Sequence, residues 1–305
     1  MHIVALLGLV LLLAGCTAPS PAPSPVSTPP EATQTLIFSP SHQGSQSPAA
    51  PAITVAPSVP LATATNVAAL PVVTRPATRM IFASPNQSPL AWARLMVQNV
   101  QSSNTSYQHK DILVTWAGVN GATDYVSYAD CSGWMNALLT QTFGLTPVDF
   151  AQWLGARRPL AKDYFAAIGN RRGLTPVTRI ADLQAGDLIV IRYLNSAPGD
   201  NTGHVLLAAA APQPHPATKP LVNDTRQWDV AVIDSSESGH GKADTRRLAD
   251  GSYHDGVGQG VMRLYTDNGG TLVGYTWSDF TDSTYYDAAT RPLAVGRIDP
   301  QFSLP

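Results

Sequence analysis

Hydrophobic positions in the first half of the folded part of the chain recur at helical spacing. Trp134, Leu138 and Leu139 share one face of a predicted helix over residues 134–143, and Gly144 supplies its C-terminal stop. The other segments with this spacing predict helices over about residues 88–100, 147–154 and 160–168. One short apolar run at residues 112–116 predicts a strand between them.

From residue 180 onward the pattern changes to β-branched runs bounded by turn residues, which is typical of buried strands. Helices followed by an antiparallel meander predict an α+β domain. The predicted strands lie in residues 185–193, 202–208, 229–236, 261–265, 271–275 and 293–298.

The N-terminus has a separate pattern. Residues 3–14 are an apolar run that is too short to span a bilayer and fits the central region of a signal peptide. The run ends in Leu-Ala-Gly-Cys, which resembles the bacterial lipobox, whose cysteine is acylated and becomes the new N-terminus. We therefore expect a lipoprotein signal peptide over residues 1–15 and lipidation at Cys16.

Composition divides the remainder into a tether and a domain. Residues 16–84 hold half of the chain's 26 prolines and very few charges, which predicts a disordered, semi-stiff tether. Residues 85–305 are left for one domain of ordinary size. The overall balance of 19 basic and 21 acidic residues indicates no nucleic-acid partner, and no cluster or loop predicts a metal or other cofactor.

Cys131 is the one cysteine of the predicted domain, because Cys16 is the only other cysteine in the chain. Asp130 is a plausible N-cap, so the thiol would lie in the first turn of a helix. Unpaired backbone N–H groups and the helix dipole favour a thiolate there. The sequence thus predicts a nucleophile where it can be activated.

Three motifs in order resemble the NlpC-type cysteine peptidases of bacterial cell walls. They are Asp-Cys-Ser-Gly at residues 130–133, Ala-Gly-Asp-Leu at 185–188 and Gly-His-Val at 203–205. The resemblance covers roughly residues 120–240. It implies a papain-like fold, with N-terminal helices packed on a small antiparallel sheet or barrel. It also implies peptidoglycan stem or cross-link peptides as substrates, and a site-organising tyrosine at Tyr128 or Tyr125.

Amide hydrolysis by a thiol needs a nucleophile, a base and a group that orients the base. Cys131 and His204 fit the first two roles, and Asp234 fits the third, where the family often has another histidine. Three neighbours of Asp234 remain alternatives for its role: Ser235, Ser236 and His240. His240 is otherwise expected to line the cleft or to face solvent. Further residues expected to bind substrate or organise the site are Asp130, Ser132, Gly133 and Trp134.

The prediction is a membrane-tethered cysteine peptidase or amidase that cleaves murein peptides. It would act at the outer membrane and periplasm of a Gram-negative cell, or on the outer face of the cell membrane otherwise. Its partners would be peptidoglycan peptides, the membrane through its lipid, and an unidentified regulator. Two alternatives stay open: a non-hydrolytic envelope binding or scaffold module of the same fold, and an amidase or acyltransferase on a non-murein substrate.

Overall fold

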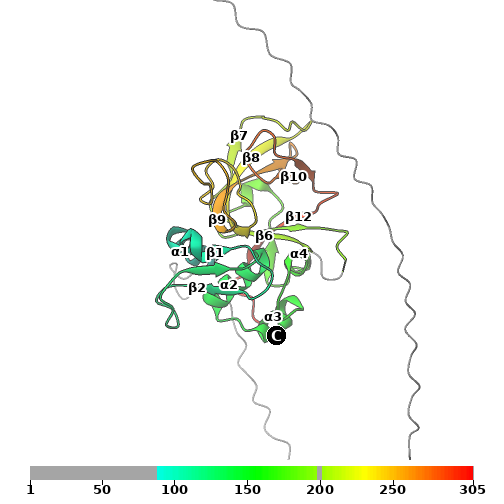
Figure 1. Ribbon diagram of the computed structural model, residues 1–305. Coiled ribbons are helices and arrows are strands. Elements are labelled where there is room, and N and C mark those ends of the chain that lie inside the picture. Colours follow the sequence, from blue (N-terminus) through cyan, green and yellow to red (C-terminus); the bar gives the residue numbers. More distant parts are fainter. Residues whose placement is uncertain (1–87, 198–200, 305) are drawn as a thin grey trace, which may run out of the picture. The chain divides into compact units, whose positions relative to one another are not determined.

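The computed structural model describes residues 88–197 and 201–304 (Figure 1). The predicted signal peptide, Cys16 and the tether lie outside these residues. The described chain is mostly β, with twelve strands in two sheets and four α-helices. The helices are α1 (Pro89–Asn99), α2 (Cys131–Phe143), α3 (Pro147–Leu154) and α4 (Ala161–Gly169).

The larger sheet has nine strands, and all of its strand pairs are antiparallel. Its order is β11-β10-β9-β8-β6-β5-β12-β4, with β7 also paired to β8. The bounds are β4 (Leu174–Pro176), β5 (Leu188–Arg192), β6 (Gly203–Ala208), β7 (Gln213–His215), β8 (Arg226–Ser236), β9 (Gly256–Thr266), β10 (Leu272–Thr276), β11 (Tyr285–Asp287) and β12 (Leu293–Ile298). A smaller sheet joins β1 (Thr105–Ser106), β3 (Val126–Tyr128) and β2 (Leu113–Thr115).

The predicted fold class is therefore wrong. A papain-like α+β domain, with helices packed on a small antiparallel sheet, was expected, but strands dominate the described chain. Two features of the sheets explain the difference. Strands β8 and β9 pair along eleven residues each, which extends the sheet well beyond the predicted segments. The small sheet is built from two- and three-residue strands, which are too short to show an alternating pattern.

The individual elements that the sequence predicted do form, with shifts of a few residues at their ends. Ser88 caps α1 by accepting a hydrogen bond from the backbone of Ala91. Asp130 caps α2, and Gly144 ends that helix in the left-handed conformation, with φ of 68°. The residues that cap the helices can thus be predicted from the sequence, even though the arrangement of the strands and helices cannot.

The nine-stranded sheet is buried on both faces. Along β5, Leu188 and Val190 pack into the core beneath the helices, while Ile189 and Ile191 pack into a second core on the opposite face. This alternation follows from the period of two in a strand, and it explains why β5 is apolar throughout. An isolated backbone bridge between Arg179 and Thr271 links the chain beyond β4 to the start of β10, so the sheet curls towards itself.

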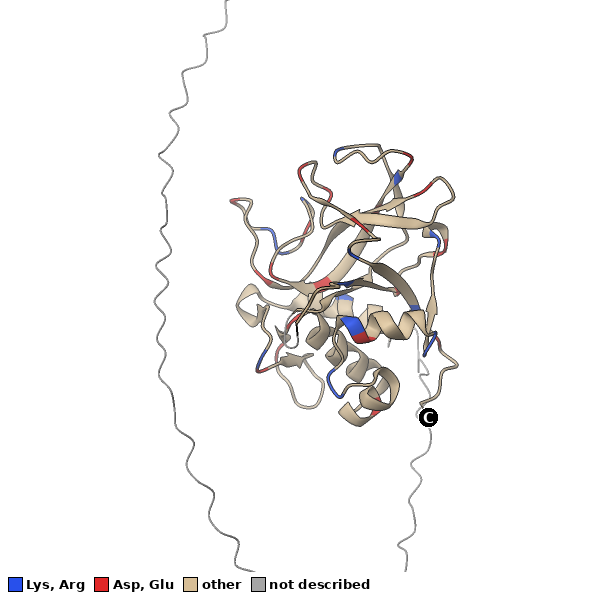
Figure 2. Cartoon of the chain, turned by 90° about the vertical axis from the view of Figure 1, so that its right-hand side faces the viewer, with Lys and Arg blue, Asp and Glu red and all other residues tan. Residues whose placement is uncertain are grey.

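The charged side chains are spread thinly over the described residues. In the view of Figure 2, Lys and Arg are scattered among Asp and Glu, mostly at loops and strand ends. Among the described residues, no helix combines the length and the apolar character needed to cross a bilayer.

Candidate active site

Cys131 is the first residue of α2 and is 5% exposed. The carboxylate of the N-cap residue Asp130 accepts a hydrogen bond of 2.6 Å from the backbone N–H of Gly133. Its two oxygens also receive the Ser132 hydroxyl (3.0 Å) and the Arg158 guanidinium (2.7 Å). The cap fixes the first turn of the helix, and with it the position of the sulfur.

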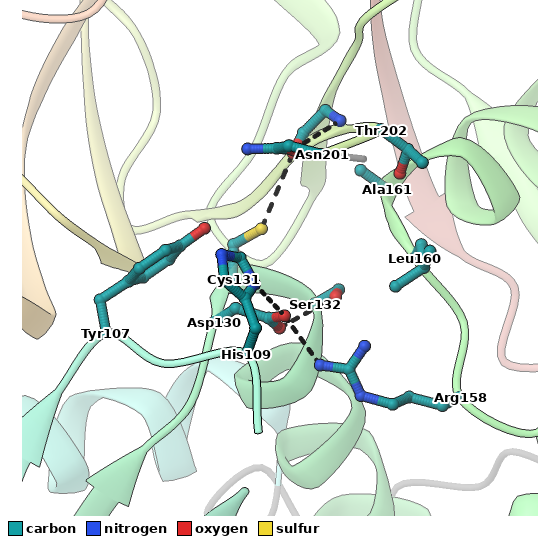
Figure 3. A pocket seen from close by; sticks show the side chains of 11 residues that line it. Tyr107, His109, Asp130, Cys131, Ser132, Arg158, Leu160, Ala161, Asn201 and Thr202 are labelled. Atoms are coloured by element: carbon teal, nitrogen blue, oxygen red, sulfur yellow. Dashed lines mark hydrogen bonds and ion pairs between the residues drawn. The ribbon is translucent and has the colours of Figure 1, made fainter. Parts of the chain in front are cut away.

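Asp130 remains ionised in this setting. Burial disfavours its charge, but the Gly133 amide, Arg158 and His109 outweigh burial and lower the pKa of the carboxyl. A methyl group on Gly133 would lie 3.0 Å from Oδ1 of Asp130 and 3.3 Å from Ile112, so this position requires a very small side chain. The Asp-Cys-Ser-Gly motif is therefore a capping unit with the thiol inside it (Figure 3).

His204 stands at the start of β6 and reaches Cys131 because Gly203 lets β6 lie close to β5. A Cβ on Gly203 would lie 1.9 Å from the carbonyl oxygen of Ile191, and its φ of 141° also favours glycine. The Gly203 carbonyl lies 3.9 Å from the Cys131 sulfur. The charge of Cys131 is close enough to the His204 ring to raise the pKa of that imidazole.

Asp234 lies in β8 with no solvent exposure, and its Oδ2 meets two imidazoles. It is 2.6 Å from Nε2 of His204 and 2.8 Å from Nε2 of His240. The Arg246 guanidinium lies 3.1 Å from the other oxygen and also pairs with Asp244 at 2.8 Å. Burial disfavours the charge of Asp234, but His240, Arg246 and the bonds from both imidazoles hold its pKa well below the usual value.

His240 is held between two hydrogen-bond acceptors. Its Nδ1 faces the Trp277 carbonyl oxygen at 2.7 Å, and its Nε2 faces the ionised Asp234. Both ring nitrogens are therefore engaged, which fixes the orientation of the ring. The Arg246 guanidinium pairs with the carboxylates of both Asp234 and Asp244.

His204 is also held in its charged form. Burial disfavours the imidazolium, but the charge of Cys131 and the hydrogen bonds to Asp234 and Cys131 outweigh it, raising the pKa of His204 to about 10. Because Nε2 faces Asp234, Nδ1 is the nitrogen left for the sulfur. The arrangement places a carboxylate, an imidazole and a thiol in the order that nucleophilic catalysis by cysteine requires.

One atom from each of His204, Asp234 and His240 lies within 4.8 Å of the others, as in a metal site. The residues nevertheless do not fit a cation. Both imidazoles bond directly to the same carboxylate oxygen, and the neighbouring Arg246, which is fully buried, already supplies a positive charge. The cluster is therefore a hydrogen-bonded network.

Residues 239–255, which have no motif, fold beneath Asp234 and supply three of the network's side chains. Glycines in β9 make room for this segment: a Cβ on Gly258 would lie 2.6 Å from Nε of Arg246. A Cβ on Gly260 would lie 2.3 Å from Asp244 and 2.7 Å from His240. The sequence signal for this contact is glycine at alternate positions of a strand, which indicates close approach by another segment.

One pocket lies at the thiol, and a second lies beside His204. One, of about 330 Å³, is lined by Cys131, Tyr107 and Arg158 among others, and Figure 3 shows the Tyr107 hydroxyl directed towards the sulfur. The other, of about 230 Å³, lies beside His204 and includes Trp277 and Glu237. Burial, followed by the charges of Cys131 and Asp130, raises the pKa of Tyr107, so its hydroxyl keeps its proton and remains a hydrogen-bond donor.

The structure brings Cys131, His204 and Asp234 together, as the sequence led us to expect, although their catalytic role remains a prediction. His240 lines the cleft beside them, at 2% exposure. Tyr107, which was not predicted, occupies the place beside the thiol that was expected for Tyr128 or Tyr125.

Other predicted site residues lie away from the reacting groups. Tyr128 donates to the Ser103 carbonyl at 3.2 Å, while Tyr125 and Trp134 pack in or against the core beneath the helices. Ser235 donates to the Ala129 carbonyl at 2.6 Å, which ties β8 to the chain before Cys131.

The Ala-Gly-Asp-Leu motif is structural rather than part of the cleft. Asp187 is 1% exposed and pairs with Arg297 of β12 at 2.8 Å. It therefore secures the turn that leads into β5, the strand against which β6 and His204 are aligned.

Comparison with known proteins gives one informative relative. No protein-family model matches the chain, and no solved structure matches it. The chain is 38% identical over 221 residues to uncharacterized protein R653 of Acanthamoeba polyphaga mimivirus, an alignment that covers 70% of this chain and 96% of the viral protein. The chain therefore belongs to the family of this mimivirus protein.

Proposed function

We propose that the protein is a cysteine hydrolase that cleaves amide bonds in peptides. One observation carries the proposal: the thiol at the N-terminus of α2 lies beside His204, which bonds to the buried Asp234 at 2.6 Å. A buried imidazole between a thiol and a carboxylate has the parts that nucleophilic catalysis needs.

In the first half of the reaction, the Cys131 thiolate attacks the carbonyl carbon and forms a tetrahedral oxyanion. The backbone N–H of Cys131 and the Tyr107 hydroxyl are the donors proposed to stabilise that charge. The oxyanion then collapses, the C–N bond breaks, and His204 gives its proton to the leaving amine. The product of this step is a thioester on Cys131.

In the second half, neutral His204 takes a proton from water, and the resulting hydroxide attacks the thioester. The C–S bond breaks, the acid is released, and the thiolate and imidazolium pair is restored. Asp234 holds His204 in the orientation and tautomer that both steps require.

The proposed substrates are peptidoglycan stem or cross-link peptides. The choice of this substrate class rests on the predicted export signal and on the ordered motifs at residues 130–133, 185–188 and 203–205. It does not rest on the fold. The cleft supports a polar peptide, since Arg158, His109 and Asn201 line one side and Glu237 lines the other.

The test is release of peptide fragments from purified murein, followed by mass spectrometry. We expect Cys131→Ala to abolish release, and Thr140→Ala, on the exposed face of the same helix, to leave it unchanged. Equal release by the Cys131→Ala variant would refute the proposal.

The rate at which iodoacetamide alkylates Cys131 separates a hydrolase from a binding module. We expect alkylation near neutral pH to be much faster than that of a free thiol, and slower in His204→Ala, because the imidazolium stabilises the thiolate. A rate equal to that of a free thiol would instead favour the non-hydrolytic scaffold.

A further inference from the structure

We propose that Arg291 forms a subsite for a carboxylate of the peptide substrate, in a pocket next to the reacting groups. This inference rests on the proposed function and deepens it, because it names the group by which an acidic peptide would be recognised. The pocket has a volume of about 490 Å³.

Aromatic rings hold the Arg291 guanidinium in place. It lies 4.0 Å from the centre of the Tyr286 ring and 4.8 Å from that of Tyr193. Tyr275, which stacks on Tyr286 with ring centres 5.3 Å apart, is the third tyrosine beside it. A guanidinium placed in this way needs little reordering to bind a ligand, so more of the binding energy is retained.

The guanidinium has no carboxylate partner among the described residues. The ion pairs of the described chain engage other arginines: Arg158, Arg246 and Arg297. Of the residues that the structure describes, those lining the pocket are neutral apart from Arg291: Tyr193, Leu194, Asn195, Ser196, Asn201 and Thr290. A cation that faces a neutral, polar pocket favours an anionic ligand.

Shared residues join this pocket to the reacting groups. Tyr193 and Asn201 line both the Arg291 pocket and the pocket beside His204. Asn201 also lines the pocket around Cys131, where its side chain accepts from the Gly203 backbone at 3.0 Å. A peptide lying across Cys131 can therefore extend one carboxylate towards Arg291.

A carboxylate is the anion best matched to this pocket. The planar fork of one guanidinium can bond both oxygens of a carboxylate, and the surrounding amides and hydroxyls add neutral donors. A stem peptide offers two such groups, the α-carboxylate of D-glutamate and the C-terminal carboxylate.

The experiment measures binding by calorimetry in the full chain carrying Cys131→Ala, so that no peptide is cleaved. The probe is L-alanyl-γ-D-glutamyl-L-lysine, used as the free acid and as two mono-amides, one at each carboxylate. We expect Arg291→Gln to weaken binding of the free acid at least tenfold, and Arg291→Lys to weaken it less, because the charge remains but the fork is lost.

In the Cys131→Ala parent, amidation of the recognised carboxylate should weaken binding of the peptide by a similar factor. In the Arg291→Gln variant, the same amidation should weaken binding no further. That pattern identifies which of the two carboxylates is bound. Arg226→Gln, a matched exposed arginine outside these pockets, should bind as the parent does. Thermal melting of each variant shows whether it is folded.

The inference is overturned if Arg291→Gln is folded and binds the free acid as tightly as the parent. It is also overturned if amidation weakens peptide binding equally in the parent and in Arg291→Gln, or if the parent binds none of the three peptides. These outcomes leave the proposed function to be judged separately, because alkylation and hydrolysis at Cys131 do not depend on this pocket.

Discussion

Asp234 differs from an ordinary third member of a catalytic triad because one of its oxygens is shared by two imidazoles. His240 is 2% exposed, and its ring is fixed by hydrogen bonds to Asp234 and to the Trp277 carbonyl oxygen. It therefore competes for the same carboxylate oxygen that stabilises the charged form of His204. His240 is thus a positioning residue that also limits how far Asp234 raises the pKa of His204.

We expect His240→Gln to shift the alkaline limb of the pH profile of kcat/KM to higher pH by about one unit, equivalent to about 1.4 kcal/mol. The reason is that loss of the second imidazole leaves the shared oxygen of Asp234 more negative towards His204. The pKa of His204 is already raised to about 10, so activity that needs its proton is present below that pH and is lost above it.

His215→Gln is the matched control, since His215 also pairs with a carboxylate, Asp229, at 2.9 Å but lies outside the cleft. Its profile should equal that of the parent protein. A His240→Gln profile that falls uniformly, with its alkaline limb unmoved, would mean that His240 acts only as a structural support.

At the scale of elements, the strand β9 is shaped by the segment that crosses it. Its glycines at 258 and 260 leave space for side chains of residues 239–255 to reach Asp234. The backbone of that segment is fastened to β9, because Val261 donates to the His240 carbonyl at 2.7 Å. A strand and a loop without regular structure thus hold the Asp234 carboxylate jointly.

Gly258→Ala tests this packing. The new methyl group would lie within 2.6 to 2.8 Å of three Arg246 side-chain atoms, so the buried arginine must move away from Asp234 and Asp244. We expect a loss of about 2–4 kcal/mol in the free energy of unfolding, measured in urea, together with reduced alkylation of Cys131.

Gly169→Ala is the corresponding control, because a Cβ there meets nothing within 4 Å. Its stability should change by no more than about 0.5 kcal/mol. Comparable losses in both variants would show that the effect of Gly258 comes from backbone conformation rather than from Arg246.

For the whole molecule, we propose that the catalytic domain is tethered to a membrane through a lipid on Cys16. The proposal rests on the apolar run and the lipobox-like residues before Cys16, which lie outside the described part of the chain. A tether rich in proline would let the domain reach substrate away from the membrane surface.

In a bacterial host, the full chain should incorporate labelled palmitate and sediment with membranes, while Cys16→Ser should do neither. The Cys131→Ala variant, in which Cys16 is the only cysteine left, should be labelled like the parent. Membrane association without label would instead indicate an uncleaved N-terminal anchor.

Much of the secondary structure, and the choice of Cys131, His204 and Asp234 as candidate site residues, could be predicted from local signals. Periodicity located α1 to α4, and capping chemistry identified Asp130 and Gly144 as helix ends. The fold class could not be predicted in the same way. It depends on how far β8 and β9 pair and on several strands of two or three residues, and neither leaves a periodic pattern.

Local sequence is enough to predict that a capped thiol begins a helix and that a histidine and an aspartate follow on apolar strands. Those features are set by side-chain chemistry and spacing. The approach of Tyr107 to the thiol, the place of Asp234 between His204 and His240, and the balance of buried charge by Arg246 follow from the packed sheet. These contacts join segments far apart in the chain, and their stability comes from burial and charge balance that arise only after the sheet has formed.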